Sequence, residues 1–146
     1  MIDYGSDNTV YLAAFWPSPE TTLHTRPFIE QTYRALRCAY DCNIQIMSDP
    51  KEFLPIAGYS YVAIEEKTAF TTHIKDFVHP KKAVYIVGNS KYRWPSGHID
   101  VQYKVHLPNA GPTPTPEGVW RHHPLYGFQA ASIVLNDRII KHGTNI

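Results

Sequence analysis

The chain has 146 residues, of which 43% are hydrophobic and 18% are charged, and its formal net charge is +1. This length fits a single domain over residues 1–146 with a core of its own, and the apolar content excludes a disordered chain. The nearly balanced charge argues against a broadly basic nucleic-acid binder but leaves room for a local basic patch. No run of about 18 apolar residues is present, so we expect no membrane span.

The N-terminus and the cysteines favour a cytoplasmic protein. Residues 1–10 lack the basic and apolar stretches of a secretory signal peptide. Cys38 and Cys42 are the only cysteines, and they are four residues apart on an expected helix, where a disulfide is geometrically awkward. We therefore expect two reduced thiols that act as small core residues rather than as nucleophiles.

The N-terminal third is expected to form a strand, a helix and a second strand. Residues 9–15 (TVYLAAF) are β-branched, aromatic and apolar, which is typical of a buried strand. A proline-rich loop follows, in which Thr25 can cap and Pro27 can help to start a helix over 28–40. The second strand is expected at 43–48.

The rest of the chain continues this alternation. Strands are expected at 59–65 and 83–88, and the segment 68–77 between them is expected to be a short helix or turn. A helix is expected over 124–141. The segment 101–108 alternates apolar with polar residues, which predicts a half-buried strand whose inward side chains are Val101, Tyr103, Val105 and Leu107.

Strands that alternate with helices or long loops are typical of an α/β domain with a mostly parallel sheet flanked by helices. Ligands of such sheets bind beyond the carboxyl ends of the strands, where the connecting loops gather. The loops expected there are residues 16–27, 66–70, 89–98 and 108–124. No GxGxxG or GxxxxGK[ST] motif is present, so we expect neither kind of nucleotide-phosphate cradle.

The eight histidines do not follow a metal-binding pattern. None stands in an HxxxH or HExxH motif, or with cysteines at a spacing typical of zinc sites. We therefore expect no metal, and we expect the histidines, including the adjacent His122 and His123, to be surface or loop residues.

Two basic groups are candidates for contact with RNA. Arg34 and Arg37 lie one turn apart on the first expected helix, and Arg34 either forms a solvated ion pair with Glu30 or meets an RNA phosphate or ribose. A basic-aromatic loop after the strand at 83–88 consists of Lys91, Tyr92, Arg93 and Trp94. Aromatic rings stack on bases and cations meet phosphates, so this loop is either an RNA contact or an ordinary surface loop with an aromatic anchor.

Three segments occur in an order and spacing that resemble a known family: YVAIEEKTAFTTHIKDFVHPKKAVYIVGN (61–89), VQYKVHLPN (101–109) and PLYGFQAASIVLNDR (124–138). They resemble the SPOUT superfamily, in particular the TrmH/SpoU-like RNA ribose 2′-O-methyltransferases. The resemblance implies a SPOUT-like fold with a C-terminal deep trefoil knot and a homodimer formed through the C-terminal helix. It also implies the cofactor S-adenosyl-L-methionine, held by the knotted loops.

The resemblance further implies roles for residues at matching positions. Arg34 matches the family's arginine and would be the main catalytic residue, while Ser90 and Tyr126 stand where the family has Glu and Asn. The implied cofactor contacts are Ile64, Glu65, Gly88, Asn89, Leu107, Pro124, Leu125, Gly127 and Phe128. The implied RNA contacts are Arg37, Lys91, Arg93 and Trp94.

The leading hypothesis is a methyltransferase that acts on a ribose 2′-oxygen of tRNA or rRNA. Because the family's Glu and Asn are replaced, the alternative is a non-catalytic SPOUT-fold protein that binds RNA or a protein partner. A third hypothesis is a methyltransferase of the same fold that modifies a base nitrogen or a protein side chain.

The last expected helix is apolar over much of its circumference. One stripe consists of Leu125, Phe128, Ala131, Leu135 and Ile139, and much of the remaining face consists of Ala130, Ile133, Val134 and Ile140. We expect this helix to be buried both by its own domain and by a second subunit.

Overall fold

A computed structural model of the chain describes the backbone of residues 10–15, 25–40, 42–47, 56–65, 67–88, 99–108, 113–114, 120–121 and 127–142. Side chains are described for these residues except 15, 25–30, 46–47, 113–114, 120–121 and 127–128.

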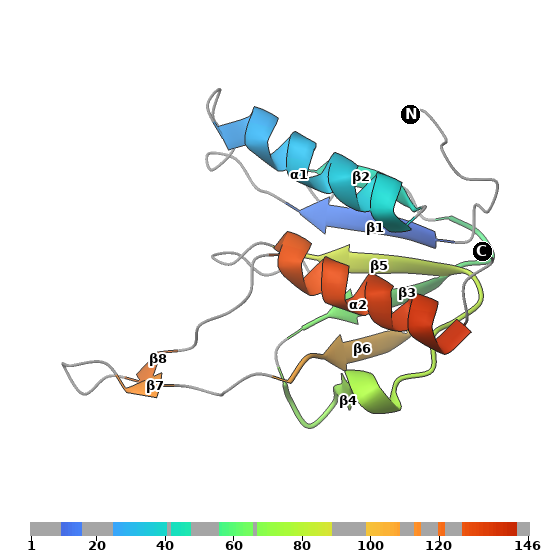
Figure 1. The fold of residues 1–146 in the computed structure, drawn as a ribbon. Coiled ribbons are helices and arrows are strands. Elements are labelled where there is room, and N and C mark those ends of the chain that lie inside the picture. The colour runs from blue at the N-terminus through green and yellow to red at the C-terminus, as the bar shows by residue number, and fades with distance from the viewer. Residues whose placement is uncertain are drawn as a thin grey trace.

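Six strands form one sheet in the described part of the chain (Figure 1). Their spatial order is β2 (Asn43–Met47), β1 (Val10–Phe15), β5 (Ala83–Val87), β3 (Ser60–Ile64), β6 (Tyr103–His106) and β4 (Thr72–His73). All neighbouring pairs in this sheet are parallel. The prediction of an α/β domain with a mostly parallel sheet is therefore confirmed. A separate antiparallel pair consists of β7 (Thr113–Pro114) and β8 (Trp120–Arg121).

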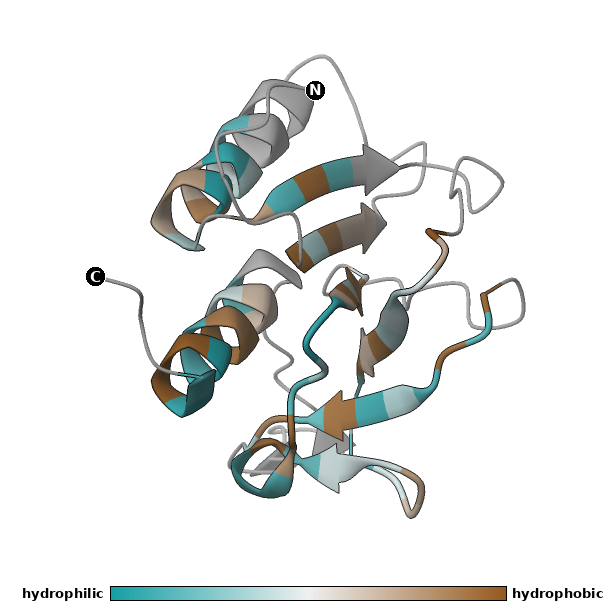
Figure 2. Ribbon diagram, turned by 90° about the vertical axis from the view of Figure 1, so that its right-hand side faces the viewer, coloured by the Kyte–Doolittle hydropathy of each residue, from teal (hydrophilic) through white to brown (hydrophobic). Residues whose placement is uncertain are grey.

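Two long helices, α1 (Thr25–Tyr40) and α2 (Gly127–His142), cover one face of this sheet (Figures 1 and 2). Helix α1 begins at Thr25 rather than at residue 28, so Thr25 belongs to the helix instead of preceding it as a cap. The segment 68–77 contains the short edge strand β4 and a 3-10 helix, η2 (Ile74–Asp76).

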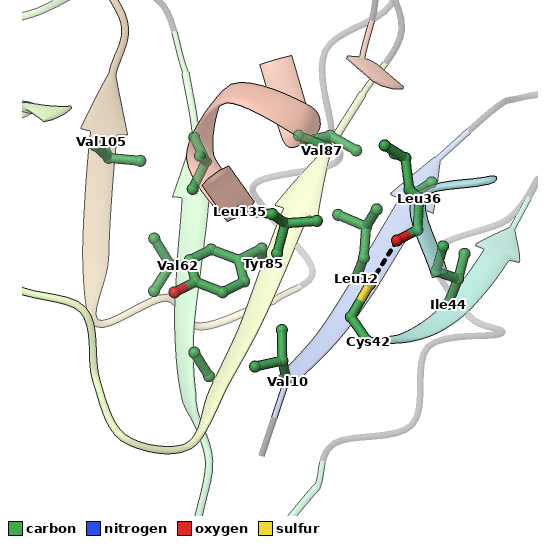
Figure 3. Close-up of a cluster of buried hydrophobic side chains, with 14 of the residues drawn as sticks. Val10, Leu12, Leu36, Cys42, Ile44, Val62, Tyr85, Val87, Val105 and Leu135 are labelled. Carbon is green, nitrogen blue, oxygen red and sulfur yellow. Dashed lines mark hydrogen bonds between the residues drawn. The ribbon is translucent and has the colours of Figure 1, made fainter. Parts of the chain in front are cut away.

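Most of the core lies between the sheet and the helices (Figure 3). Leu12, Val62 and Tyr85 of three neighbouring strands are fully buried there, against Ala131 and Leu135 of α2. Side chains of a strand alternate between the two faces of its sheet, so the intervening residues form a second apolar cluster on the opposite face. Strand β5 is buried at every position because it is central and covered on both faces.

Strand β6 differs from the predicted alternation. Val105 is fully buried, but Tyr103 stands at the rim, where it is exposed and packs edge-on against Phe77 at 5.9 Å between ring centroids. Val101 packs against the cluster on the opposite face, and His106, expected to be exposed, is buried. His106 is covered by the residue before β4, since Thr71 Oγ1 lies 2.9 Å from its Nδ1.

Helix α2 buries one face and exposes the other. Ala131, Val134 and Leu135 are at most 2% exposed, whereas Ile133 is 44% exposed and Ile140 is 72% exposed. These two isoleucines are seven residues apart and therefore lie on the same side of the helix. The domain itself thus covers only part of the apolar circumference.

Cys42 lies beyond the end of α1, not within it as predicted. It is buried, and its thiol donates to the backbone oxygen of Leu36 at 3.8 Å (Figure 3). Cys38 is exposed on α1 instead of being a core residue, and both cysteines are free thiols. No helix among the described residues is long and apolar enough to cross a membrane.

Candidate functional site

The carboxyl ends of three adjacent strands bring four of the predicted cofactor residues to one edge of the sheet. Ala63 of β3 pairs with Ile86 of β5, and Ile64 pairs with Val105 of β6. The residues that follow these pairs, at the carboxyl ends of the three strands, therefore lie side by side.

At this edge, Ile64 and Leu107 are half-buried apolar side chains that pack against the helix-side core. The backbone N–H of Glu65 donates to the backbone oxygen of Val105 at 2.9 Å, which extends the β3–β6 ladder by one residue. Gly88 follows β5 and is half-buried. The edge therefore offers partly accessible apolar surface beside backbone that has no side chain at Gly88.

The last helix begins at the same edge. Figure 1 shows α2 starting beside the arrowhead of β5 and running back over the sheet. Gly127 and Phe128, two of the implied cofactor contacts, are the first two residues of α2, which begins three residues later than expected. The first turn of an α-helix has free N–H groups and a partial positive charge, so the backbone here can donate to a bound polar group.

Arg34 lies on the solvent side of α1, while Tyr33 and Leu36 of the same helix are buried against the core. Its guanidinium is therefore accessible to a ligand. Arg37 is half-buried on the same helix. The side chain of Glu30 lies outside the described part of the chain, so the proposed ion pair with Arg34 stays a prediction.

The fold can be compared with solved structures. It is similar to the crystal structure of a TrmH/SpoU tRNA modifying enzyme from A. aeolicus, with a TM-score of 0.57 and 15% sequence identity. The match covers 94% of this chain and 78% of that chain. The fold is SPOUT-like. No protein-family model matches the sequence, and no curated protein matches it, so the similarity concerns the fold alone.

Several predicted residues of this SPOUT-like domain lie outside the described part of the chain, and their roles stay predictions. They are Ser90, Tyr126, Asn89, Pro124, Leu125, Lys91, Arg93 and Trp94. The roles of the described site residues are likewise predictions, although Ile64, Glu65, Gly88 and Leu107 do meet at one edge.

A buried polar network at the other end of the SPOUT-like sheet was not predicted. Arg138 of α2 is 7% exposed, and its guanidinium donates to the backbone oxygens of Pro80 at 2.6 Å and Lys81 at 2.7 Å. It also donates to the Tyr85 hydroxyl at 3.0 Å. Burial raises the pKa of Tyr85 to about 12, although the positive charge of Arg138 acts in the opposite direction.

His79 continues this network to the neighbouring residue of α2. Its Nε2–H donates to Asp137 Oδ2 at 2.7 Å, because a carboxylate oxygen accepts. Its Nδ1 then accepts from the Tyr85 hydroxyl, also at 2.7 Å. Burial lowers the pKa of His79 despite the opposing hydrogen bond and charge of Asp137. In the series of hydrogen bonds from Arg138 through Tyr85 and His79 to Asp137, each group therefore donates to the next. The imidazole of His79 is neutral in this arrangement.

Lys141 completes the attachment of α2. Its ammonium group donates to the backbone oxygens of Ile74 at 2.5 Å and Phe77 at 2.8 Å, and forms an ion pair with Asp137 at 3.0 Å. The last turns of α2 are thus bound to the segment 74–82 that leads into β5. This network holds the fold together rather than forming a ligand site, because its groups bond one another.

The expectation that the histidines are surface or loop residues is wrong for His106, which is a buried residue of β6; His79 does lie in a loop, but it is buried there. The neighbouring sequence did not indicate the burial of either residue, because a segment distant in the sequence covers each of them. Among the described side chains, no group of three or more His, Cys, Asp or Glu residues is placed to hold a metal ion.

Proposed function

We propose that this protein is an S-adenosyl-L-methionine-dependent RNA methyltransferase that modifies a ribose 2′-oxygen of tRNA or rRNA. The observation that carries the proposal is the SPOUT-like fold, whose solved neighbour is a tRNA modifying enzyme. The meeting of Ile64, Gly88 and Leu107 at one edge of the sheet supports it. We propose a cytoplasmic location as well, which the two free thiols support.

The residues at this edge fit an adenosyl group. Small-molecule sites are mostly apolar, with a few polar groups that set orientation. Ile64 and Leu107 offer half-buried apolar surface on neighbouring strands, and Gly88 leaves the adjacent backbone open. Gly127 and Phe128 would add the first turn of α2. When bound, the cofactor supplies an electrophilic methyl group.

Arg34 is proposed to act on the RNA. A guanidinium stays protonated, so it serves as a poor base and a good partner for a phosphate or a ribose oxygen. Its exposure on α1 is compatible with contact to a large substrate. Ser90 and Tyr126 are proposed as further polar groups, and Arg37 with Lys91, Arg93 and Trp94 as RNA contacts.

A trefoil knot and a homodimer are part of the proposal. The attachment of α2 to the segment 74–82 through Arg138 and Lys141 supports a C-terminal segment held firmly by the preceding chain. The exposed Ile133 and Ile140 support a subunit contact through α2, because large apolar side chains on one helix face favour a partner.

Calorimetric titration with S-adenosyl-L-methionine, and with its demethylated product, tests the cofactor site. We expect saturable binding that Leu107→Ala weakens about tenfold, because it removes apolar contact area. Tyr103→Ala is the matched control, since this side chain lies at the start of β6, away from the carboxyl edge that Leu107 follows, and should leave the affinity unchanged. Absence of binding at millimolar cofactor would refute both methyltransferase hypotheses.

Transfer of a labelled methyl group to bulk RNA, followed by nucleoside analysis, tests the reaction. We expect 2′-O-methylated nucleosides, and a fall of about 10- to 100-fold for Arg34→Ala. Gln31→Ala, which alters another exposed residue of α1, is the control. Unchanged activity in Arg34→Ala would remove this residue from the mechanism, and methylated bases or protein would favour the third hypothesis.

A non-catalytic SPOUT-fold protein that binds RNA or a protein partner is the second candidate. It is favoured by the replacement of the family's Glu and Asn with Ser90 and Tyr126. RNA binding with no cofactor binding in the calorimeter would support it.

A further inference from the structure

The segment between β3 and β4 carries a large apolar side chain that the domain leaves uncovered. Figure 1 shows this segment projecting from the end of the sheet that carries β6 and β4. Phe70 lies in its turn and is 85% exposed. Isolated exposed apolar residues are common, so the conformation and neighbours of this one decide whether it has a role.

Two threonines connect the residues of this turn by hydrogen bonds. The backbone N–H of Thr68 donates to Thr71 Oγ1 at 2.9 Å, and the Thr71 hydroxyl donates to the backbone oxygen of Thr68 at 3.0 Å. The backbone N–H of Phe70 donates to Thr68 Oγ1 at 3.1 Å. The ring of Phe70 is therefore presented to solvent from a hydrogen-bonded turn.

The turn is also anchored to the sheet. Thr71 Oγ1 is 2.9 Å from His106 Nδ1. Because the Thr71 hydroxyl hydrogen is directed to Thr68, His106 is assigned as the donor, with its hydrogen on Nδ1. His106 is buried beneath this contact, which explains why its exposure was mispredicted. Burial lowers the pKa of His106, and the charges of His73 and Lys67 act in the same direction.

This anchoring places the turn beside the proposed cofactor edge. The segment starts directly after Glu65, at the carboxyl end of β3, and His106 directly precedes Leu107. An RNA strand that reaches the strand ends would therefore pass close to Phe70.

The charges around the turn include a suitable phosphate contact. Three lysines lie near the turn in the sequence or in the sheet: Lys67 and Lys75 are exposed, and Lys104 is half-buried. The described acidic side chains near the turn are those of Glu65 and Asp76. A protein interface needs roughly 1,000 Å² and several apolar anchors. A single aromatic ring among hydroxyl groups and lysines is better suited to an unpaired base, which offers a flat face beside a charged backbone.

We propose that Phe70 is a stacking platform for an unpaired RNA base next to the modified nucleotide, with Lys67 contacting the adjoining phosphate. This inference rests on the proposed function, since it takes RNA as the substrate. It adds a specificity element: the substrate must be single-stranded, or unpaired, at the position that meets Phe70.

Fluorescence anisotropy of the full chain with a fluorescein-labelled single-stranded oligoribonucleotide and with a blunt RNA duplex tests this. Phe70→Ala should weaken single-strand binding about tenfold, whereas Phe70→Trp should preserve it, because stacking needs an aromatic face. Duplex binding should not respond to Phe70→Ala. Lys67→Ala should reduce the salt dependence of binding by about one phosphate contact. Val78→Ala, which truncates another exposed apolar side chain, is the matched control.

The outcomes separate this inference from the proposed function. Single-strand binding within twofold of wild type in Phe70→Ala, or an equal loss in Val78→Ala, would overturn the stacking role and leave the methyltransferase proposal standing. Wild-type protein that binds no RNA would overturn both. Calorimetric cofactor binding and the thermal midpoint should be the same in Phe70→Ala and wild type, and a fall in either would show that the ring has a structural role instead.

Discussion

Replacing Arg138 with methionine should destabilise the domain more than any substitution of an exposed basic residue. Arg138→Met keeps a long apolar stem but removes the guanidinium that donates to Pro80, Lys81 and Tyr85 at 2.6, 2.7 and 3.0 Å. Water cannot readily replace these bonds, because the side chain is almost completely buried. The backbone oxygens and the hydroxyl would then lack their donor.

The structure sets the size of the effect. A hydrogen bond to a charged group contributes about 1.5–3 kcal/mol to stability, but bonds of one network do not add independently. Removing the arginine also removes the cost of burying its charge, which is several kcal/mol per ion. The contribution of the three hydrogen bonds is partly offset by the cost of burying the charge. We therefore expect a loss of about 3 kcal/mol in the free energy of unfolding.

Urea unfolding followed by far-UV circular dichroism measures this loss. Lys81→Met is the matched control, since its side chain is exposed on the same segment and its backbone oxygen is unaltered. The control should change stability by no more than about 0.5 kcal/mol. Arg138→Lys retains the charge and fewer bonds, and should fall between wild type and Arg138→Met. A loss below about 1 kcal/mol in Arg138→Met, or one equal to the control, would refute the reasoning.

Three further predictions follow from burial. Burial lowers the pKa of His79, so the unfolded chain takes up a proton before the folded chain does, and stability should decline as the pH falls through about 6.5. His79→Gln should flatten that decline in urea titrations, and an unaltered slope would contradict this. Cys38 should react with a thiol reagent in the native protein and Cys42 only after unfolding; rapid reaction of both thiols in the native protein would contradict the burial of Cys42 in the core. Ile133→Asp and Ile140→Asp should convert a dimer to a monomer in sedimentation velocity, so a persisting dimer would exclude this helix face as the contact.

Local sequence patterns predicted most of the strands and helices. The continuous apolar run at 83–87 predicted β5 because a central parallel strand needs apolar side chains on both faces. The apolar stripe of helix α2 predicted the burial of Ala131 and Leu135, but Val134, counted on the other face, is equally buried. The two-residue strand β4 could not be predicted in this way, since it is too short to show a period and exists through its pairing with β6.

The proposed site was predictable only at its strand ends. Because parallel strands end at the same edge, Ile64, Gly88 and Leu107 could be expected to meet before the structure was known. The order of the strands was not accessible in the same way: β5 lies between β1 and β3 although neither is its immediate predecessor in the chain. The roles of Ser90 and Tyr126, which lie outside the described part of the chain, still rest on family resemblance alone.

Residue chemistry and short-range periodicity thus determined which segments become strands and helices and which side chains are apolar enough for the core. Tertiary structure alone decided that Arg138 is a buried hydrogen-bond donor and His79 a buried neutral imidazole, since Arg138 bonds residues 53 to 58 positions away and His79 bonds Asp137, 58 positions away. It likewise decided that Phe70 stays in solvent while His106 is covered. Burial of a polar or aromatic side chain depends on which distant segment packs against it, and no local pattern contains that information.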